Sequence, residues 1–286
     1  VRGHDIDGDK GAGVYVVNND SNKSTKVVLK NIIAKDNKAY ERGGFINADK
    51  KGTEVTLVNA IVHNNQVTDG GDGGSAIFSN NDAKVKILNS TIANNKNNGS
   101  NGGAVHVREE GSFDIYNSII WNNHNKEGKL ANMTGGEDND FIVYNSIMNK
   151  GGNNGADSHE NGDNTGKINY LTYDPQFVDA ANGNYRLKSG SNPGINQGSN
   201  DNYNSLAGNH ATDVDIEGKP RTIGNTIDMG AIEDTIPYVA GAGNVLYVKK
   251  GATGNGSAWG NEIGEVADAL RWAKHRINLG GETLSI

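Results

Sequence analysis

A seven-residue motif that begins with asparagine and is apolar in its middle occurs five times along the chain. Successive copies begin 28, 30, 28 and 28 residues apart, at Asn31–Asn37, Asn59–Asn65, Asn89–Asn95, Asn117–Asn123 and Asn145–Gly151. A constant period of this size is typical of repeat architectures, in which each period forms one unit that packs on its neighbours. The chain is therefore expected to form a stack of similar units.

The residues before each anchoring asparagine alternate with a period of two, which is the period of a β-strand. The positions two and four before it are wholly apolar: Leu29, Leu57, Ile87, Ile115 and Val143, and Val27, Val55, Val85, Phe113 and Phe141. Equivalent strands stacked in parallel about 4.8 Å apart would join these columns into one core. We therefore predict an all-β fold, a parallel β-helix (solenoid) with about 28–30 residues per coil.

The composition agrees with a thin core and many corners, because only 34% of residues are hydrophobic and 40 of the 286 are glycine. A net charge of −7 argues against a nucleic-acid partner, since phosphates require a basic face. No apolar run is long enough to predict a transmembrane segment in this chain. The absence of cysteine excludes a disulfide scaffold and a thiolate metal site.

The anchoring asparagines predict a structural ladder. At a coil corner, an inward amide can bond both the corner backbone and the asparagine of the next coil. The ladder would consist of Asn31, Asn59, Asn89, Asn117 and Asn145. The alternative is that these residues occupy exposed turns because asparagine tolerates the left-handed conformation.

The outward positions of the predicted strands carry charges of alternating sign. Lys26, Glu54 and Lys84 occupy equivalent places in successive periods. Opposite charges on adjacent strands favour the correct register, so we expect a structural role for this column.

Three phrases near the C-terminus carry a resemblance to a known family. They are Tyr173–Gly198, Asp215–Arg221 and Thr226–Glu233. They resemble the signature D-P-x-F-V-D…G-x-Y-R-L…S-P-x-I-[DN]-x-G, then D-x-x-G-x-P-R and I-D-x-G-A-x-E, of bacterial β-helix surface proteins of the choice-of-anchor Q type. The resemblance implies a right-handed helix, which is also the usual hand of parallel crossovers, and a location outside the cell or on the bacterial cell surface.

The pattern divides the chain into three parts. Residues 1–234 form the predicted β-helix and residues 235–243 a linker. In residues 244–286 we expect a short strand, Asn244–Val248, followed by an amphipathic helix with its apolar stripe at Ile263, Val266, Ala267, Leu270 and Ala273. This part resembles the opening of such β-helices, so it either begins a second, truncated solenoid or folds back as a cap on the first.

The repeat positions lack the clusters that chemistry on this fold requires. Pectate-lyase-like enzymes need several acids for Ca²⁺ and a basic residue, and glycosidases need paired carboxylates. Single acids separated by lysines occur here instead. In the loops, Asp201, Asp213 and Asp215 lie near His210 in sequence, and their convergence in space is the alternative.

One segment has the alternating carboxylates of a calcium site. Asp5, Asp7 and Asp9 are candidate Ca²⁺ ligands, although the spacing is not that of an EF-hand. The alternative is a polar corner turn. No other cofactor is predicted.

Three aromatic residues predict a platform for sugar stacking. Tyr116 and Tyr144 share the outward position before the ladder asparagine, and Trp121 follows a corner. The alternative is that the long loops at residues 124–140 and 150–166 cover these rings.

We therefore expect a non-catalytic extracellular bacterial surface protein, adhesin-like or structural. Its partners would be extracellular glycans or other surface proteins. A polysaccharide-binding module and a pectate-lyase-like polysaccharide-degrading enzyme stay open as alternatives.

Overall fold

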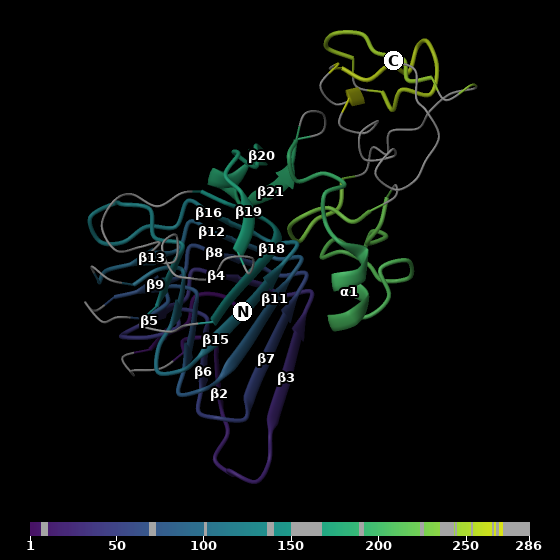
Figure 1. The fold of residues 1–286 in the computed structure, drawn as a ribbon. Helices are drawn as coiled ribbons and strands as arrows, with labels where there is room; N and C mark the ends of the chain where they lie inside the picture. The colour runs from purple at the N-terminus through teal and green to yellow at the C-terminus, as the bar shows by residue number, and fades with distance from the viewer. Residues whose placement is uncertain are drawn as a thin grey trace.

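The chain folds as an all-β, right-handed parallel β-helix (Figure 1). The computed structural model describes residues 1–6, 11–68, 73–99, 102–135, 140–149, 168–188, 192–223, 226–234, 243, 245–252, 254–264, 266, 269 and 270. Among these residues no helix is long and apolar enough to span a membrane.

Three parallel sheets form the walls of the solenoid. One five-stranded sheet has the order β17-β14-β10-β6-β2, so the stack contains five coils. Its strands are β2 (Val14–Val17), β6 (Ile46–Asp49), β10 (Ile77–Asn80), β14 (Val105–Val107) and β17 (Met133–Gly135). A four-stranded sheet contains β1 (Asp5–Ile6), β5 (Lys38–Ala39), β9 (Gln66–Val67) and β13 (Lys96–Asn97).

The third sheet has ten strands and bends at the coil corners. Its first half contains β3 (Thr25–Lys30), β7 (Thr53–Val58), β11 (Lys84–Leu88) and β15 (Ser112–Tyr116), and its second half β4 (Ile33–Lys35), β8 (Ile61–His63), β12 (Thr91–Ala93) and β16 (Ile119–Trp121). The long strand β18 (Asp140–Met148) belongs to both halves, and β19 (Ile168–Leu171) pairs with it.

The predicted register of the apolar columns is confirmed. Leu29 pairs with Leu57, Leu57 with Ile87, Ile87 with Ile115 and Ile115 with Val143. From the second coil onward these side chains are 0% exposed and belong to one core cluster. Parallel stacking thus produces the continuous core that the period of two predicts.

A continuous inward ladder of asparagines also exists, but it begins six residues after the predicted one. Asn37 Nδ2 donates to Asn65 Oδ1 at 2.7 Å, Asn65 Nδ2 to Asn95 Oδ1 at 3.0 Å, and Asn95 Nδ2 to Asn123 Oδ1 at 3.0 Å. All four residues are buried. The inward amides therefore close the second corner of each coil.

The predicted column occupies the first corner, where it forms a ladder only in part. Its five members all have the left-handed conformation, with φ between 43° and 57°: Asn31, Asn59, Asn89, Asn117 and Asn145. Four of them, Asn59, Asn89, Asn117 and Asn145, donate side-chain hydrogen bonds to the C-terminal part of the chain. Two rungs of a ladder form, Asn59 Nδ2 to Asn31 Oδ1 at 3.2 Å and Asn117 Nδ2 to Asn89 Oδ1 at 3.1 Å.

The charge column behaves as expected in the first two coils. Lys26 Nζ lies 3.1 Å from Glu54 Oε2 across the β3–β7 pair. Lys84 stands opposite Glu54 in the next pair.

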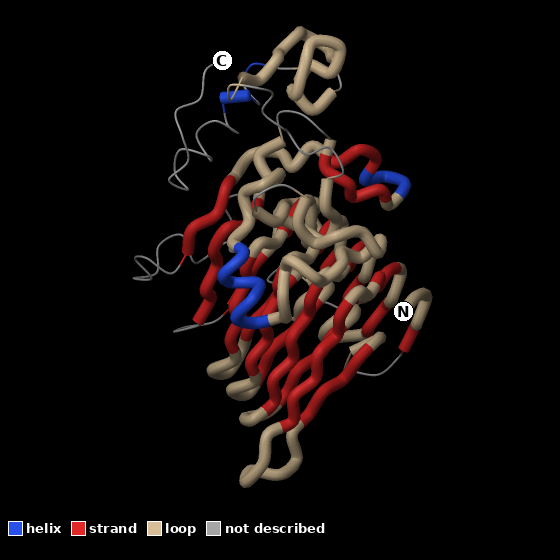
Figure 2. Tube along the Cα trace, turned by 90° about the vertical axis from the view of Figure 1, so that its right-hand side faces the viewer, coloured by secondary structure: helices blue, strands red, loops and turns tan. Residues whose placement is uncertain are grey.

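The chain after the solenoid lies on its outside. An antiparallel hairpin, β20 (Phe177–Asp179) and β21 (Asn184–Leu187), is followed by helix α1 (Asn200–Leu206). Figure 2 shows α1 lying across the strands of the large sheet. Tyr203 of α1 packs on Val58 and Leu88, which face out of the coils.

The described residues after position 243 have a small apolar core, whereas positions 235–242 of the expected linker lie outside the described residues. Leu246, Ile263 and Ala269 share this core, and the Tyr247 and Trp259 rings meet edge to face at 5.0 Å. Of the expected strand Asn244–Val248, position 244 lies outside the described residues, and Val248 forms an isolated bridge with Ile263. Val266, Ala269 and Leu270 are helical, but Val266 and Leu270 are exposed, so the predicted stripe is only partly buried. The other two stripe positions, 267 and 273, lie outside the described residues.

Candidate functional site

The C-terminal segment, residues 192–223 and 226–234, crosses the coils of the solenoid, and we call it the strap. It contacts the fifth coil where Asn145 Nδ2 donates to Gln197 O at 3.4 Å, and the fourth where Asn117 Nδ2 donates to Ser199 O at 3.0 Å. It reaches the second coil where Asn59 Nδ2 donates to Val214 O at 2.9 Å. Lys30 Nζ, in the first coil, lies 2.8 Å from Asp213 Oδ2.

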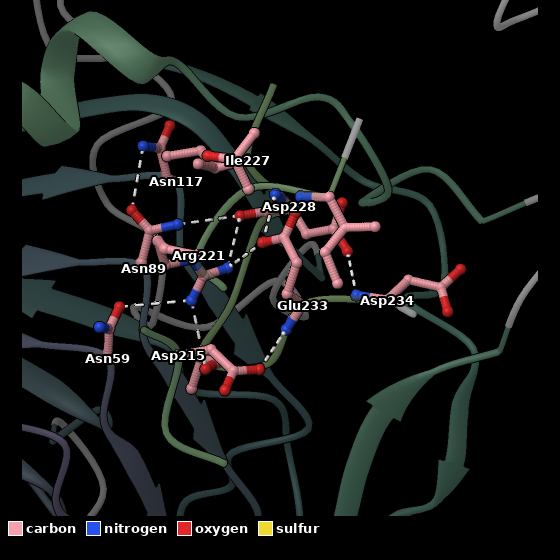
Figure 3. A network of polar contacts seen from close by, with 12 residues as sticks. Asn59, Asn89, Asn117, Asp215, Arg221, Ile227, Asp228, Glu233 and Asp234 are labelled. Atoms are coloured by element: carbon pink, nitrogen blue, oxygen red, sulfur yellow. Dashed lines mark hydrogen bonds and ion pairs between the residues drawn. The ribbon is translucent and has the colours of Figure 1, made fainter. Parts of the chain in front are cut away.

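A buried arginine fixes the strap to the outer face of the solenoid (Figure 3). The Arg221 and Glu233 side chains are both 0% exposed and form an ion pair of 2.7 Å. Arg221 Nη1 also donates to Ala231 O at 3.2 Å and to Asn59 Oδ1 at 3.3 Å. Arg221 thus takes the place next to Asn59 that the next rung of the ladder would occupy, and Asn89 bonds Asp228 O instead.

Two further carboxylates complete this network. Asp228 accepts hydrogen bonds from Asn196 N at 2.7 Å and Asp234 N at 2.6 Å. Asp215 accepts from Glu233 N at 2.9 Å and from Glu217 N at 2.8 Å. Buried charge is tolerated only when it is paired and fully hydrogen-bonded, and this network meets that condition for its carboxylates.

The network is short of positive charge, which changes the acidity of its acids. Burial raises the pKa of Glu233 to about 7, although the Arg221 charge opposes the shift. Burial, and then the nearby Glu233 carboxylate, raise the pKa of Asp228 well above its ordinary value. Because both side chains are enclosed, these acids cannot reach a polymeric substrate, and their role is to hold the strap.

A groove lies between the fourth-coil corner and the β20–β21 hairpin. Its volume is about 450 Å³, within the range of ligand sites. Its apolar wall combines Trp121 at the end of β16 with Phe177 of the hairpin, which pack in the same apolar cluster. The complete lining is Ala93, Asn94, Trp121, Asn122, Asp174, Gln176, Phe177, Ala180 and Lys188.

The polar groups of the groove are held by short-range contacts. Asn122 Nδ2 donates to Asn94 Oδ1 at 2.6 Å, and Asn94 Nδ2 donates to the Tyr185 hydroxyl at 3.0 Å. Asp174 Oδ1 accepts from Gln176 N at 2.7 Å, which fixes the turn before β20. Among the residues that the structure describes, the side-chain amide of Gln176 and the side-chain ammonium of Lys188 make no hydrogen bond or ion pair. Both groups are therefore available to a ligand.

The three predicted aromatic residues do not form one platform. Tyr116 and Tyr144 stack at 6.2 Å with an angle of 15° between their planes, but Tyr116 also packs against the apolar cluster that contains Tyr203 and Ile227 of the strap. Trp121 belongs to a different apolar cluster, on the other side of the corner. Within the described residues, Tyr116 thus packs beside Tyr203 of α1. The alternative placed loops over these rings, but positions 136–139 and 150–166 of those loops lie outside the described residues.

Of the candidate calcium ligands, only Asp5 can be placed. It is exposed in β1, with Oδ2 4.0 Å from Lys38 Nζ, whereas positions 7 and 9 lie outside the described residues. No group of three or more histidine or acidic side chains able to hold a metal exists within the described ranges.

The loop acids near His210 are not gathered into one site. Asp213 pairs with Lys30 and accepts from the Tyr203 hydroxyl at 3.1 Å, while Asp215 is buried in the network. His210 Nδ1 lies 2.8 Å from Asn204 Oδ1, and Asp201 belongs to the first turn of α1. Asp213 and Asp215 are thus used in separate structural contacts, and Asp201 is exposed at the start of α1.

Comparison with protein-family models, with curated proteins and with solved structures found no match for this chain.

Sequence reasoning missed Arg221, Asp228 and Glu233 as the centre of the strap, although all three belong to the phrases that carry the family resemblance. It also missed Gln176, Phe177 and Lys188 as groove residues. These three residues lie within the Tyr173–Gly198 phrase of the same resemblance.

Proposed function

We propose that this chain is the rod of a non-catalytic extracellular bacterial surface protein, adhesin-like or structural. The observation that carries the proposal is the strap, which contacts the first, second, third, fourth and fifth coils. A solenoid whose coils otherwise contact only their neighbours gains contacts along its whole length in this way. Such reinforcement suits a protein that must stay folded outside the cell.

The resemblance to the choice-of-anchor Q surface proteins supports this proposal from a second direction. The D-x-x-G-x-P-R and I-D-x-G-A-x-E phrases supply Asp215, Arg221, Asp228 and Glu233, the buried centre of the strap. The phrases therefore have a structural use in the very part of the chain that distinguishes this protein from a bare solenoid.

A polysaccharide-degrading enzyme is the less favoured reading. The acids with raised pKa values are enclosed around Arg221, and an acid that cannot contact the sugar chain cannot protonate or deprotonate it. A binding module is compatible with the rod, since the groove beside Trp121 is open to solvent.

Location and catalysis can be tested separately. An antibody against the purified chain should label intact cells of the organism that encodes it, and brief protease treatment of those cells should remove the signal. Labelling only after lysis would refute the surface proposal.

Incubation with acidic polysaccharides should give no rise in ultraviolet absorbance from unsaturated products, and turnover that a chelator abolishes would refute the non-catalytic assignment.

A further inference from the structure

We infer that the groove between the fourth-coil corner and the β20–β21 hairpin binds a neutral glycan, with one pyranose ring against Trp121. The inference rests on the proposed surface function, which it deepens by naming a ligand class. It uses one residue of the predicted platform, Trp121, and assigns the remaining contacts to side chains of the hairpin region.

The apolar wall provides the first part of the argument. One face of a pyranose ring presents mainly C–H groups, and burying them against an aromatic surface removes apolar area from water. Trp121 is half-buried and packs against a buried apolar cluster that includes Ile119, Ile147 and Leu187. A ring held in this way offers a fixed surface and loses little conformational freedom on binding.

The polar wall matches the rim of hydroxyl groups. A sugar hydroxyl both donates and accepts a hydrogen bond, and a side-chain amide offers both functions in one plane. The Asn122 and Gln176 side chains are exposed on the groove, and Asp174 offers a carboxylate. Only one Asp174 oxygen is used by its turn, so the other is available to accept from a hydroxyl.

The groove is organised before any ligand binds. The Asn122, Asn94 and Tyr185 side chains form a chain of hydrogen bonds that sets the direction of the Asn122 amide. Lys188 N donates to Gln176 O at 3.0 Å, which ties the two strands of the hairpin at this point. Polar groups fixed by such neighbours bind more tightly than mobile ones.

The charge of the groove favours a neutral glycan over an acidic one. Asp174 and Lys188 carry opposite charges, so the formal charge of the lining is zero. An acidic polysaccharide would also approach a chain of net charge −7, which disfavours association at low salt. Nucleic acid is disfavoured for the same reason.

The test is glycan binding by the full chain. We expect binding to one or more neutral oligosaccharides on an array that also carries uronic-acid oligosaccharides, followed by titration calorimetry with the best neutral hexasaccharide. Trp121→Ala and Gln176→Ala should each weaken binding at least about tenfold, the equivalent of one well-made contact. Trp259→Ala is the matched control, because it removes a tryptophan that is 72% exposed in the part of the chain after position 243.

Several outcomes would overturn the inference: no binding to any neutral glycan, selective binding to uronic-acid glycans, or binding that Gln176→Ala and Trp121→Ala leave unchanged. Circular dichroism and thermal unfolding establish that each variant is folded, and the exposed Gln176 keeps the test decisive if Trp121→Ala is unstable. Failure here leaves the surface labelling intact. Failure of surface labelling leaves the measured affinity intact, so the two proposals are distinguishable.

Discussion

Asparagine performs two different tasks in this protein, one at each corner of a coil. At the first corner it adopts the left-handed conformation and turns its amide outward, as at Asn59 and Asn89. At the second corner it lies inside the coil: Asn65 Nδ2 donates to Ala34 O and Asn95 Oδ1, and its Oδ1 accepts from the Asn37 amide. Each buried amide therefore satisfies several groups at once, which makes it costly to replace.

The inward ladder gives a prediction at the residue scale. Asn95→Ala removes the partner of Asn65 on one side and of Asn123 on the other, so the free energy of unfolding should fall by about 1–3 kcal/mol per unsatisfied group. Urea unfolding measures this loss. Asn22→Ala, at an exposed position, should change stability by less than about 0.5 kcal/mol, and equal losses in the two variants would contradict the ladder.

The raised pKa of Glu233 predicts a pH dependence. Burial places its folded-state pKa at about 7, against an ordinary value of 4.5. The folded protein therefore binds a proton more tightly than the unfolded chain, and stability should fall as pH rises from 4.5 through 7. Asp228 acts in the same direction, whereas His63, whose pKa burial lowers, acts in the opposite one.

The comparison that isolates Glu233 is between the wild type and Glu233→Gln. Glutamine cannot titrate, so the variant should lose part of this slope, on the order of 2 kcal/mol across the interval, when unfolding is measured in urea at several pH values. The exposed Glu110→Gln should keep the wild-type slope. An unchanged slope in Glu233→Gln would refute the assignment.

At the scale of elements, the strands were predictable and the strap was not. The period of two at Leu57, Ile87 and Ile115 reports directly which face is buried, since a strand alternates its side chains. The same parity placed Tyr116 and Tyr144 in one outward column, and their rings do stack. The alternation of side chains between the two faces of a strand stops at a left-handed corner, however. The sequence pattern therefore could not show whether Asn59 or Asn65 points inward.

The strap carries no periodic signal, because its contacts join residues far apart in sequence. Arg221 reaches Asn59 across 162 positions, and Asn117 reaches Ser199 across 82. Helix α1 has seven residues and only one buried side chain, Tyr203, which is too little for a sequence pattern to reveal. The candidate groove depends on the docking of the β20–β21 hairpin, so only its Trp121 side could be anticipated.

The anchoring of the strap predicts unequal effects of two arginine substitutions. Arg221→Met leaves Glu233 and Asp228 buried without their counter-charge, so the free energy of unfolding should fall by about 3–5 kcal/mol, and amide exchange in α1 should accelerate. Arg186→Met removes an ion pair of 2.6 Å with Glu217 whose arginine is 43% exposed, and should cost less than about 1 kcal/mol. Equal losses would mean that the strap does not depend on Arg221.

At the scale of the whole molecule, the structure combines a repetitive solenoid with a non-repetitive strap. The solenoid follows from local rules, which is why the fold class was predictable from periods alone. The strap and the groove follow from one particular packing of the residues after the solenoid against the coil corners. Binding specificity is therefore expected to reside in the non-repetitive part, in agreement with the position of the groove.

The strap has a consequence for how the protein bears tension. A bare stack pulled from one end would peel one turn at a time, each step rupturing a single interface. Here the bonds from Asn145 at one end and from Lys30 at the other couple distant turns through one continuous length of backbone. A force directed along the stack would load these attachments in shear and at the same time. The protein would therefore resist stretching far better than a stack of the same turns without the strap.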